Sequence, residues 1–186
     1  DNGLHIFKGV PFAAPIDGPN RFRAPQPRES WSGIRDATTI GLISRQAPLP
    51  PPFGSPLPEA GADCLNLNVW SPDVTGSLPV YVWIHGGAFY GGSSVEAVYD
   101  GASFARNGVV CVTINYRLGS QGFLHLADHF PELAESGNAG LLDQIAALKW
   151  VQQNIAAFGG DPTCVTIAGE SAGGMSVSSL LSSSLA

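Results

Sequence analysis

Three short runs of apolar, β-favouring residues stand out in the second half of the chain. They cover residues 80–84, 109–114 and 165–168, and none of them alternates regularly with polar positions. A strand that is apolar on both of its faces is typical of a sheet with other layers packed on both sides. The three runs therefore predict buried strands of one central sheet.

Between the last two runs, the spacing of apolar residues changes to that of a helix. From about residue 140 to 157, apolar side chains recur three or four positions apart, at Leu141, Leu142, Ile145, Leu148, Val151 and Ile155. A Gly-Gly-Asp-Pro sequence at 159–162 ends this segment, and a second helix is expected from Ala172 to about Ser182. This alternation predicts an α/β fold with a mostly parallel central sheet and helices on both faces.

Composition and charge mainly exclude certain classes of protein. The 186 residues are 44% hydrophobic and 13% charged, which fits a globular domain and not a disordered chain. The net charge of −6, without a cluster of basic residues, argues against a nucleic-acid partner. No apolar run approaches the roughly 18 residues that a membrane-spanning helix needs, so no membrane span is expected.

Cysteine and proline add two expectations. The three cysteines are too few and too scattered for a disulfide framework or a zinc site, and Cys111 and Cys164, inside apolar runs, are interpreted as small core residues. The proline-rich stretch 48–58 cannot be a helix or a central strand. It is expected to be an exposed loop between an N-terminal region of short strands and the main core.

The first candidate for chemistry is Ser171, in the sequence Gly-Glu-Ser-Ala-Gly at 169–173. The predicted strand 165–168 runs directly into it and a predicted helix follows, which is the context of a nucleophile elbow. A sharp strand-to-helix turn would hold Ser171 in a strained conformation with its Oγ raised above the sheet, and the flanking glycines would leave room for close chain approach. The alternative is a chance match in a chain with 23 glycines.

The second candidate is the sequence His-Gly-Gly-Ala-Phe at 85–89, directly after the predicted strand 80–84. Small residues at this place let main-chain N–H groups approach a substrate carbonyl oxygen, and such donors are typically worth about 3 to 4 kcal/mol each in the transition state. One donor is expected on Ala172, the residue after the nucleophile, and another in this loop. The alternative is a plain glycine turn after a strand.

At these residues the chain resembles the N-terminal part of a type-B carboxylesterase, the family that includes bacterial para-nitrobenzyl esterases and cholinesterases. Residues 158–173 match the serine signature of that family at every defined position, and residues 63–70 match its second signature in part. Four further segments are also similar to the family: 7–11, 21–25, 115–119 and 138–144.

The resemblance implies an α/β-hydrolase fold and a role for each matching residue. Ser171 would be the acyl-accepting nucleophile of an ester hydrolase, and Gly87, Ala88 and Ala172 would supply the oxyanion N–H groups, with Gly86 shaping the turn. Glu170 would be a buried carboxylate that supports the site. The resemblance further implies an internal ion pair between Arg117 and Asp143, and no metal or organic cofactor.

Two differences from the family pattern change what is expected of the disulfide and of the substrate. Many relatives pair the signature cysteine with one upstream, but no cysteine precedes Cys64, so that bridge cannot form. The stretch from Ala47 to Cys64 holds no tryptophan, whereas cholinesterases bind choline there by cation–π attraction. A small alkyl or aryl ester is therefore the expected substrate.

The base and acid that would activate a serine are not recognisable in the sequence. Only 15 residues follow Ser171, none of them Asp, Glu or His, whereas in this fold the triad acid and histidine come after the serine. All four histidines, at 5, 85, 125 and 129, precede it and are interpreted as surface or lining residues.

We therefore expect residues 1–186 to be the N-terminal part of a single α/β-hydrolase domain, truncated after the elbow helix and inactive alone. Two rivals stay open: a non-catalytic adhesion or binding protein that kept the fold, and a serine hydrolase acting on amides, thioesters or lactones. The sequence leaves open the oligomeric state and whether the compartment is cytoplasmic or secreted.

Overall fold

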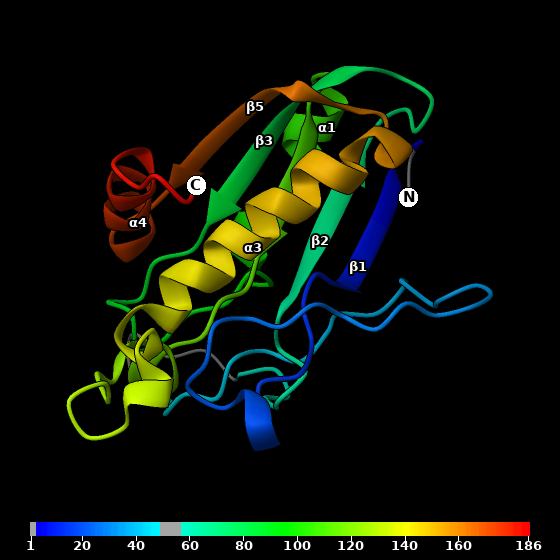
Figure 1. The fold of residues 1–186 in the computed structure, drawn as a ribbon. Helices are drawn as coiled ribbons and strands as arrows, with labels where there is room; N and C mark the ends of the chain where they lie inside the picture. Colours follow the sequence, from blue (N-terminus) through cyan, green and yellow to red (C-terminus); the bar gives the residue numbers. More distant parts are fainter. Residues whose placement is uncertain (1–2, 49–56) are drawn as a thin grey trace.

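A computed structural model describes residues 3–48 and 57–186, and a single five-stranded sheet runs through it (Figure 1). The strands lie in the order β1-β2-β4-β3-β5 across the sheet. Their bounds are β1 His5–Pro11, β2 Asn66–Ser71, β3 Leu78–Ile84, β4 Val110–Ile114 and β5 Gly160–Gly169. The three strands expected from their apolar runs, β3, β4 and β5, are confirmed as strands of one sheet, but β5 is only partly buried. The expected loop at 48–58 falls largely outside the described residues.

The sheet is mixed, which corrects the expectation of a mostly parallel one. β3 runs parallel to both β4 and β5, but β1 pairs with β2, and β2 with β4, in antiparallel fashion. The reason is the length of the connection from β2 to β3, which is residues 72–77 only. A parallel return needs a crossover of about a dozen residues, so β2 must run against β3 and β4.

Helices cover both faces of this sheet, as expected, with α3 on one side and α1 behind it (Figure 1). α3, Ala139–Asn154, packs Ile145, Ala147 and Val151 onto the main core, and its last turns continue as the 3₁₀ segment η5, Ile155–Phe158. α1, Ala102–Arg106, places Ala105 against Trp70 and Cys111 on the opposite face. The expectation of a buried Cys111 is thereby confirmed.

The remaining helices are short, except for the one that follows β5. α4, Ala172–Leu181, packs Leu180 into the main core on the α3 side. The other segments are α2, Gly119–Phe123, and the 3₁₀ turns η1, Gly18–Asn20, η2, Ala97–Tyr99, η3, Pro131–Leu133, and η4, Ser136–Asn138. Within residues 3–48 and 57–186, no helix combines the length and the apolar character that crossing a bilayer requires.

The start of β5 is irregular, and this corrects the expectation for Cys164. Leu78 of β3 pairs with Gly160, but Val80 pairs with Val165, so residues 161–164 bulge out of the ladder. Asp161 Oδ1 accepts hydrogen bonds from the N–H and the hydroxyl of Thr163, 2.8 and 2.7 Å long, which closes a local turn. Cys164 therefore follows a turn and is exposed to solvent, not a core residue.

Candidate active site

The backbone at Ser171 is strained as the sequence predicted. Ser171 lies between β5 and α4 with φ 52° and ψ −118°, a conformation that L-residues rarely adopt. Gly173 packs so tightly that a β-carbon there would overlap the Ile84 carbonyl oxygen and lie 2.9 Å from the His85 oxygen. Glycine at 173 is thus what allows α4 to begin against the end of β3, and Ser171 is exposed above it.

The first turn of α4 leaves a main-chain donor free beside the serine. Gly173 N donates to the Glu170 oxygen at 2.8 Å, and Met175 N donates to the Ser171 oxygen at 3.0 Å. Ala172 opens the helix, and across the described residues its N–H has no acceptor. A free N–H at a helix N-terminus favours a negatively charged group close to it.

The turn after β3 presents two more free donors. Gly87, Ala88 and Phe89 all have positive φ, at 105°, 52° and 63°. The Gly87 oxygen accepts hydrogen bonds from Tyr90 N and Gly91 N, at 3.1 and 2.9 Å, whereas the N–H groups of Gly87 and Ala88 donate to nothing in the described part of the chain. Holding Ala88 and Phe89 at positive φ costs about 1–3 kcal/mol each, the kind of strain that clusters at functional sites.

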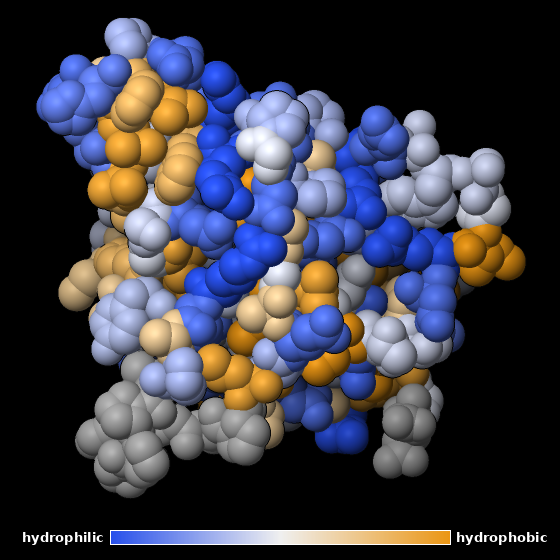
Figure 2. Space-filling view, turned by 90° about the horizontal axis from the view of Figure 1, so that it is seen from below, coloured by the Kyte–Doolittle hydropathy of each residue, from blue (hydrophilic) through white to orange (hydrophobic). Residues whose placement is uncertain are grey.

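These two motifs meet in space, because β3 and β5 are hydrogen-bonded neighbours and Ile84 pairs with Gly169. A β-carbon on Gly86 would collide with the Glu170 side chain and lie 3.2 Å from the Ser171 β-carbon. All of the expected site residues therefore lie together at the carboxyl ends of two adjacent parallel strands. They are Gly86, Gly87, Ala88, Glu170, Ser171 and Ala172. Figure 2 views this end of the molecule, where hydrophilic residues form much of the surface and hydrophobic residues gather in patches around them.

Glu170 is exposed, which corrects the expectation of a buried carboxylate. It follows β5, and β5 pairs with β3 on one side only within residues 3–48 and 57–186. No described element covers the outer side of that strand, so the carboxylate faces Gly86 on one side and solvent on the other.

His85 is buried directly beside the turn, which agrees with its interpretation as a lining residue. Its side chain is 1% exposed, stacks on the Tyr116 ring with centroids 4.5 Å apart, and donates from Nδ1 to the Gly86 oxygen at 2.8 Å. Burial lowers the pKa of His85 to about 4, so the ring is neutral near pH 7. Two sequence signals point to this position: it follows an apolar strand directly and opens the His-Gly-Gly-Ala-Phe motif.

None of the described histidines hydrogen-bonds to Ser171. The His125 ring lies 3.4 Å from Asp128 and is exposed, His129 is exposed, and His85 is occupied with Gly86. The described residues also contain no group of three or more His, Cys, Asp or Glu side chains placed to hold a metal ion. The site as described thus combines an exposed serine with free main-chain N–H groups, and no described histidine contacts the serine.

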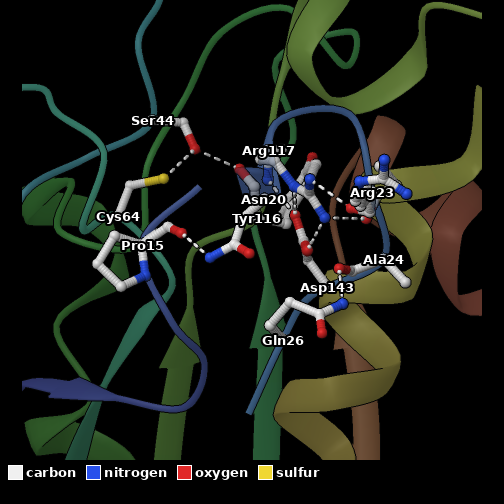
Figure 3. A network of polar contacts seen from close by, with 11 residues as sticks. Pro15, Asn20, Arg23, Ala24, Gln26, Ser44, Cys64, Tyr116, Arg117 and Asp143 are labelled. Atoms are coloured by element: carbon white, nitrogen blue, oxygen red, sulfur yellow. Dashed lines mark hydrogen bonds and ion pairs between the residues drawn. The ribbon is translucent and has the colours of Figure 1, made fainter. Parts of the chain in front are cut away.

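The ion pair between Arg117 and Asp143 is confirmed and anchors the start of α3 beneath the site (Figure 3). The guanidinium donates to both carboxylate oxygens at 2.6 and 2.7 Å, the Arg117 N–H adds a bond of 3.0 Å, and both side chains are buried. The next residue, Gln144, donates to Ser176 Oγ of α4 at 3.1 Å. The ion pair therefore holds α3 in place, and α4, the helix after Ser171, is hydrogen-bonded to α3.

Ser44 lies beside the buried Cys64 (Figure 3). Ser44 Oγ lies 3.5 Å from Cys64 Sγ and donates to the Tyr116 oxygen at 2.5 Å. All three cysteines are free, which confirms that the bridge common in the family is missing.

Comparisons with known proteins agree with this geometry. The model of the "Carboxylesterase family" matches residues 1–186. The chain is 54% identical over 184 residues to a para-nitrobenzyl esterase of Bacillus subtilis (strain 168), covering 97% of this chain and 37% of the relative. It is 44% identical over 190 residues to a phenmedipham hydrolase of Pseudarthrobacter oxydans, covering 97% and 36%.

Solved structures give the same result. A PNB esterase superposes with a TM-score of 0.89 at 50% identity, and a Geobacillus stearothermophilus carboxylesterase at pH 6.2 with 0.91 at 47%. Each comparison covers 100% of this chain and 38% of the solved one, so the chain spans little more than a third of the length of its relatives. The chain belongs to the carboxylesterase family and has the α/β-hydrolase fold.

Proposed function

We propose that this chain carries the nucleophile and the oxyanion hole of a serine carboxylic ester hydrolase acting on small alkyl and aryl esters. One observation carries the proposal: a strained, exposed Ser171 is in contact with a turn whose main-chain N–H groups are free. Gly87 is partly exposed and Ala88 is exposed, so their free donors are accessible to a substrate oxygen next to Ser171.

The reaction proceeds in two steps. Ser171 Oγ attacks the ester carbonyl carbon while its proton passes to a base, a histidine outside the described residues. The carbonyl oxygen becomes an oxyanion that accepts hydrogen bonds from the N–H groups of Gly87, Ala88 and Ala172, and the tetrahedral intermediate collapses as the alcohol leaves with the proton. Water then attacks the acyl-enzyme by the same route and releases the acid.

Glu170 and Gly86 support this arrangement. Gly86 permits the contact between the turn and the elbow, because any side chain at 86 would collide with the Glu170 carboxylate. Glu170 places a negative charge beside the serine, where it favours the positively charged form of a nearby base. The proposed chemistry uses no metal or organic cofactor, and neither a nucleic acid nor a membrane span takes part in it.

The test uses the protein expressed from its complete coding sequence. We expect hydrolysis of para-nitrophenyl acetate and covalent labelling by a fluorophosphonate, both abolished by Ser171→Ala. The matched control is Ser178→Ala, an exposed serine of the same helix that should keep both activities. Absence of turnover and labelling in the wild type would favour a non-catalytic protein. Faster turnover of amides or thioesters than of esters would mean that those compounds, and not small esters, are the substrates.

A further inference from the structure

The direction of the Gly87 N–H depends on one peptide plane. In a trans peptide the carbonyl and the N–H point to opposite sides, so the Gly86 oxygen fixes where the Gly87 N–H points. That oxygen accepts the 2.8 Å hydrogen bond from His85 Nδ1, below the turn. The Gly87 N–H is thereby directed away from the His85 ring.

Gly92 packs directly onto this hydrogen bond. A β-carbon at 92 would lie 2.5 Å from the Gly86 oxygen and 2.6 Å from His85 Nδ1. Gly92 also has φ +99°, a conformation that suits glycine. The His85–Gly86 contact is therefore confined between the Tyr116 ring, on which His85 stacks, and the backbone at 92.

Gln46, from a distant part of the chain, holds Gly92 at both of its main-chain polar groups. Gln46 Nε2 donates to the Gly92 oxygen and Gln46 Oε1 accepts from the Gly92 N–H, each at 2.8 Å. The same Nε2 also lies 3.2 Å from the Ser44 oxygen. An amide is the one uncharged side-chain group that can donate and accept side by side in this way.

The segment that carries Gln46 supports the other side of the histidine as well. Ser44 Oγ donates to the Tyr116 oxygen, and the Tyr116 hydroxyl donates to the His85 oxygen at 3.0 Å. Residues 44–46 are thus connected to the turn at 86–88 by two series of contacts. One series passes through Tyr116 and the other through Gly92.

We propose that Gln46 is a positioning residue for the oxyanion hole: its side-chain amide clamps Gly92, which confines the His85–Gly86 hydrogen bond and so orients the Gly87 N–H. The proposal rests on the function proposed above. Because the donor acts on charge that develops in the transition state, loss of the clamp lowers kcat and leaves KM nearly unchanged.

The experiment compares Gln46→Met, Gln46→Glu and Gln152→Met in the protein expressed from its complete coding sequence. Methionine keeps the length of the side chain without hydrogen bonds, and glutamate keeps the acceptor for Gly92 N–H but places a charge against the Gly92 oxygen. Gln152 is an exposed glutamine of α3 with one hydrogen bond, to the Pro162 oxygen, and serves as the matched control.

We expect both Gln46 variants to lower kcat about tenfold or more, with KM within about twofold, because small displacements of a catalytic group have large effects on rate. Affinity for a trifluoromethyl ketone, whose serine adduct carries the oxyanion, should fall by the same factor. Gln152→Met should change none of these. A Gln46→Met protein with a lower melting temperature but unchanged kcat and ketone affinity would overturn the proposal, as would a loss confined to KM.

Failure of the proposed function is recognised separately. If the wild type shows no Ser171-dependent hydrolysis, hydrogen exchange of the segment 86–92 decides whether Gln46 holds the turn. Exchange should accelerate in Gln46→Met and not in Gln152→Met. Equal exchange in the two variants would overturn the clamp itself.

Discussion

Acidification provides a sharp test of the buried histidine beside the turn at 86–88. Burial lowers the pKa of His85 to about 4 in the folded protein, against an ordinary value of 6.5. The unfolded chain therefore binds this proton more readily, and stability is fully present above about pH 6.5 and falls as the pH drops toward 4. Integrating between the two pKa values gives a loss of about 2 kcal/mol on going from pH 7 to pH 5, and about 3 kcal/mol once both forms are protonated.

The geometry explains why the proton is costly. In the neutral ring Nδ1–H donates to the Gly86 oxygen, while Nε2 is buried with no partner among the described residues. A proton on Nε2 would create a buried charge and an unsatisfied donor at once. The low pKa therefore follows from the burial of the ring, which removes the water that would stabilise its charged form.

The assay is urea unfolding at pH 7 and pH 5 of the wild type and of His85→Asn. Asparagine can place an amide N–H where Nδ1 stands and does not titrate, so it removes the pH-dependent part alone. We expect the wild type to lose about 2 kcal/mol more than the variant between the two pH values. His129→Asn, at an exposed histidine, should keep the wild-type dependence. An equal pH dependence in wild type and His85→Asn would refute the reasoning.

Three further predictions concern the packing around the site. Ser44→Cys should form a disulfide with Cys64, seen by thiol titration, and raise the unfolding free energy by about 2 kcal/mol, because closing a 20-residue loop contributes about 3 and the lost serine hydrogen bond about 1. Gly86→Ala should lower kcat at least tenfold in steady-state assays, because its β-carbon would push against Ser171. Asp143→Asn should lower the unfolding free energy by about 3–5 kcal/mol in urea titrations, since it leaves a buried guanidinium without its counter-charge.

Each of these predictions has a matched control. Ser44→Ala removes the same hydroxyl without offering a thiol, and its stability should not respond to reductant. In Gly76→Ala the new β-carbon would come no closer than 3.3 Å to the Leu78 side chain and 3.4 Å to the Asp73 oxygen, so this variant should keep kcat. Asp17→Asn breaks an ion pair between exposed side chains, with Arg45, and should change stability little. A wild-type kcat in Gly86→Ala would contradict the contact between turn and elbow.

The parallel half of the fold could be predicted because its elements are buried in a regular way. β3, β4 and α3 are apolar where they meet the core, so spacing alone located them to within two or three residues. The site followed from the same information, because the carboxyl ends of neighbouring parallel strands meet at one edge of the sheet. Ser171 and the turn at 86–88 each follow such a strand.

The antiparallel half could not be predicted, since its strands carry polar residues whose partners lie far away in sequence. Asn68 sits in the middle of β2 and is 1% exposed. Its amide donates to Ser94 Oγ at 3.2 Å and Thr113 Oγ1 at 3.0 Å and accepts from Gly9 N at 3.1 Å. A buried amide satisfied by three separate segments leaves no periodic signal, and the same holds for Gln46 and Gly92.

Glu170 and Cys164 show a different limit, because their exposure depends on what packs around β5. The apolar sequence of β5 predicts that the two faces of this strand are covered, but it does not predict what lies along its edges. Whether its second edge is paired depends on chain that lies elsewhere. Within residues 3–48 and 57–186 that edge is open, and Val165 and Ile167 are only half-buried, although both pack against the main core. The position of Ser171, by contrast, depends only on the β3–β5 pairing and on glycines at 86, 169 and 173, all of which the described residues contain. Ser171 can therefore be in place while the exposure of Glu170 still depends on what packs along the outer edge of β5.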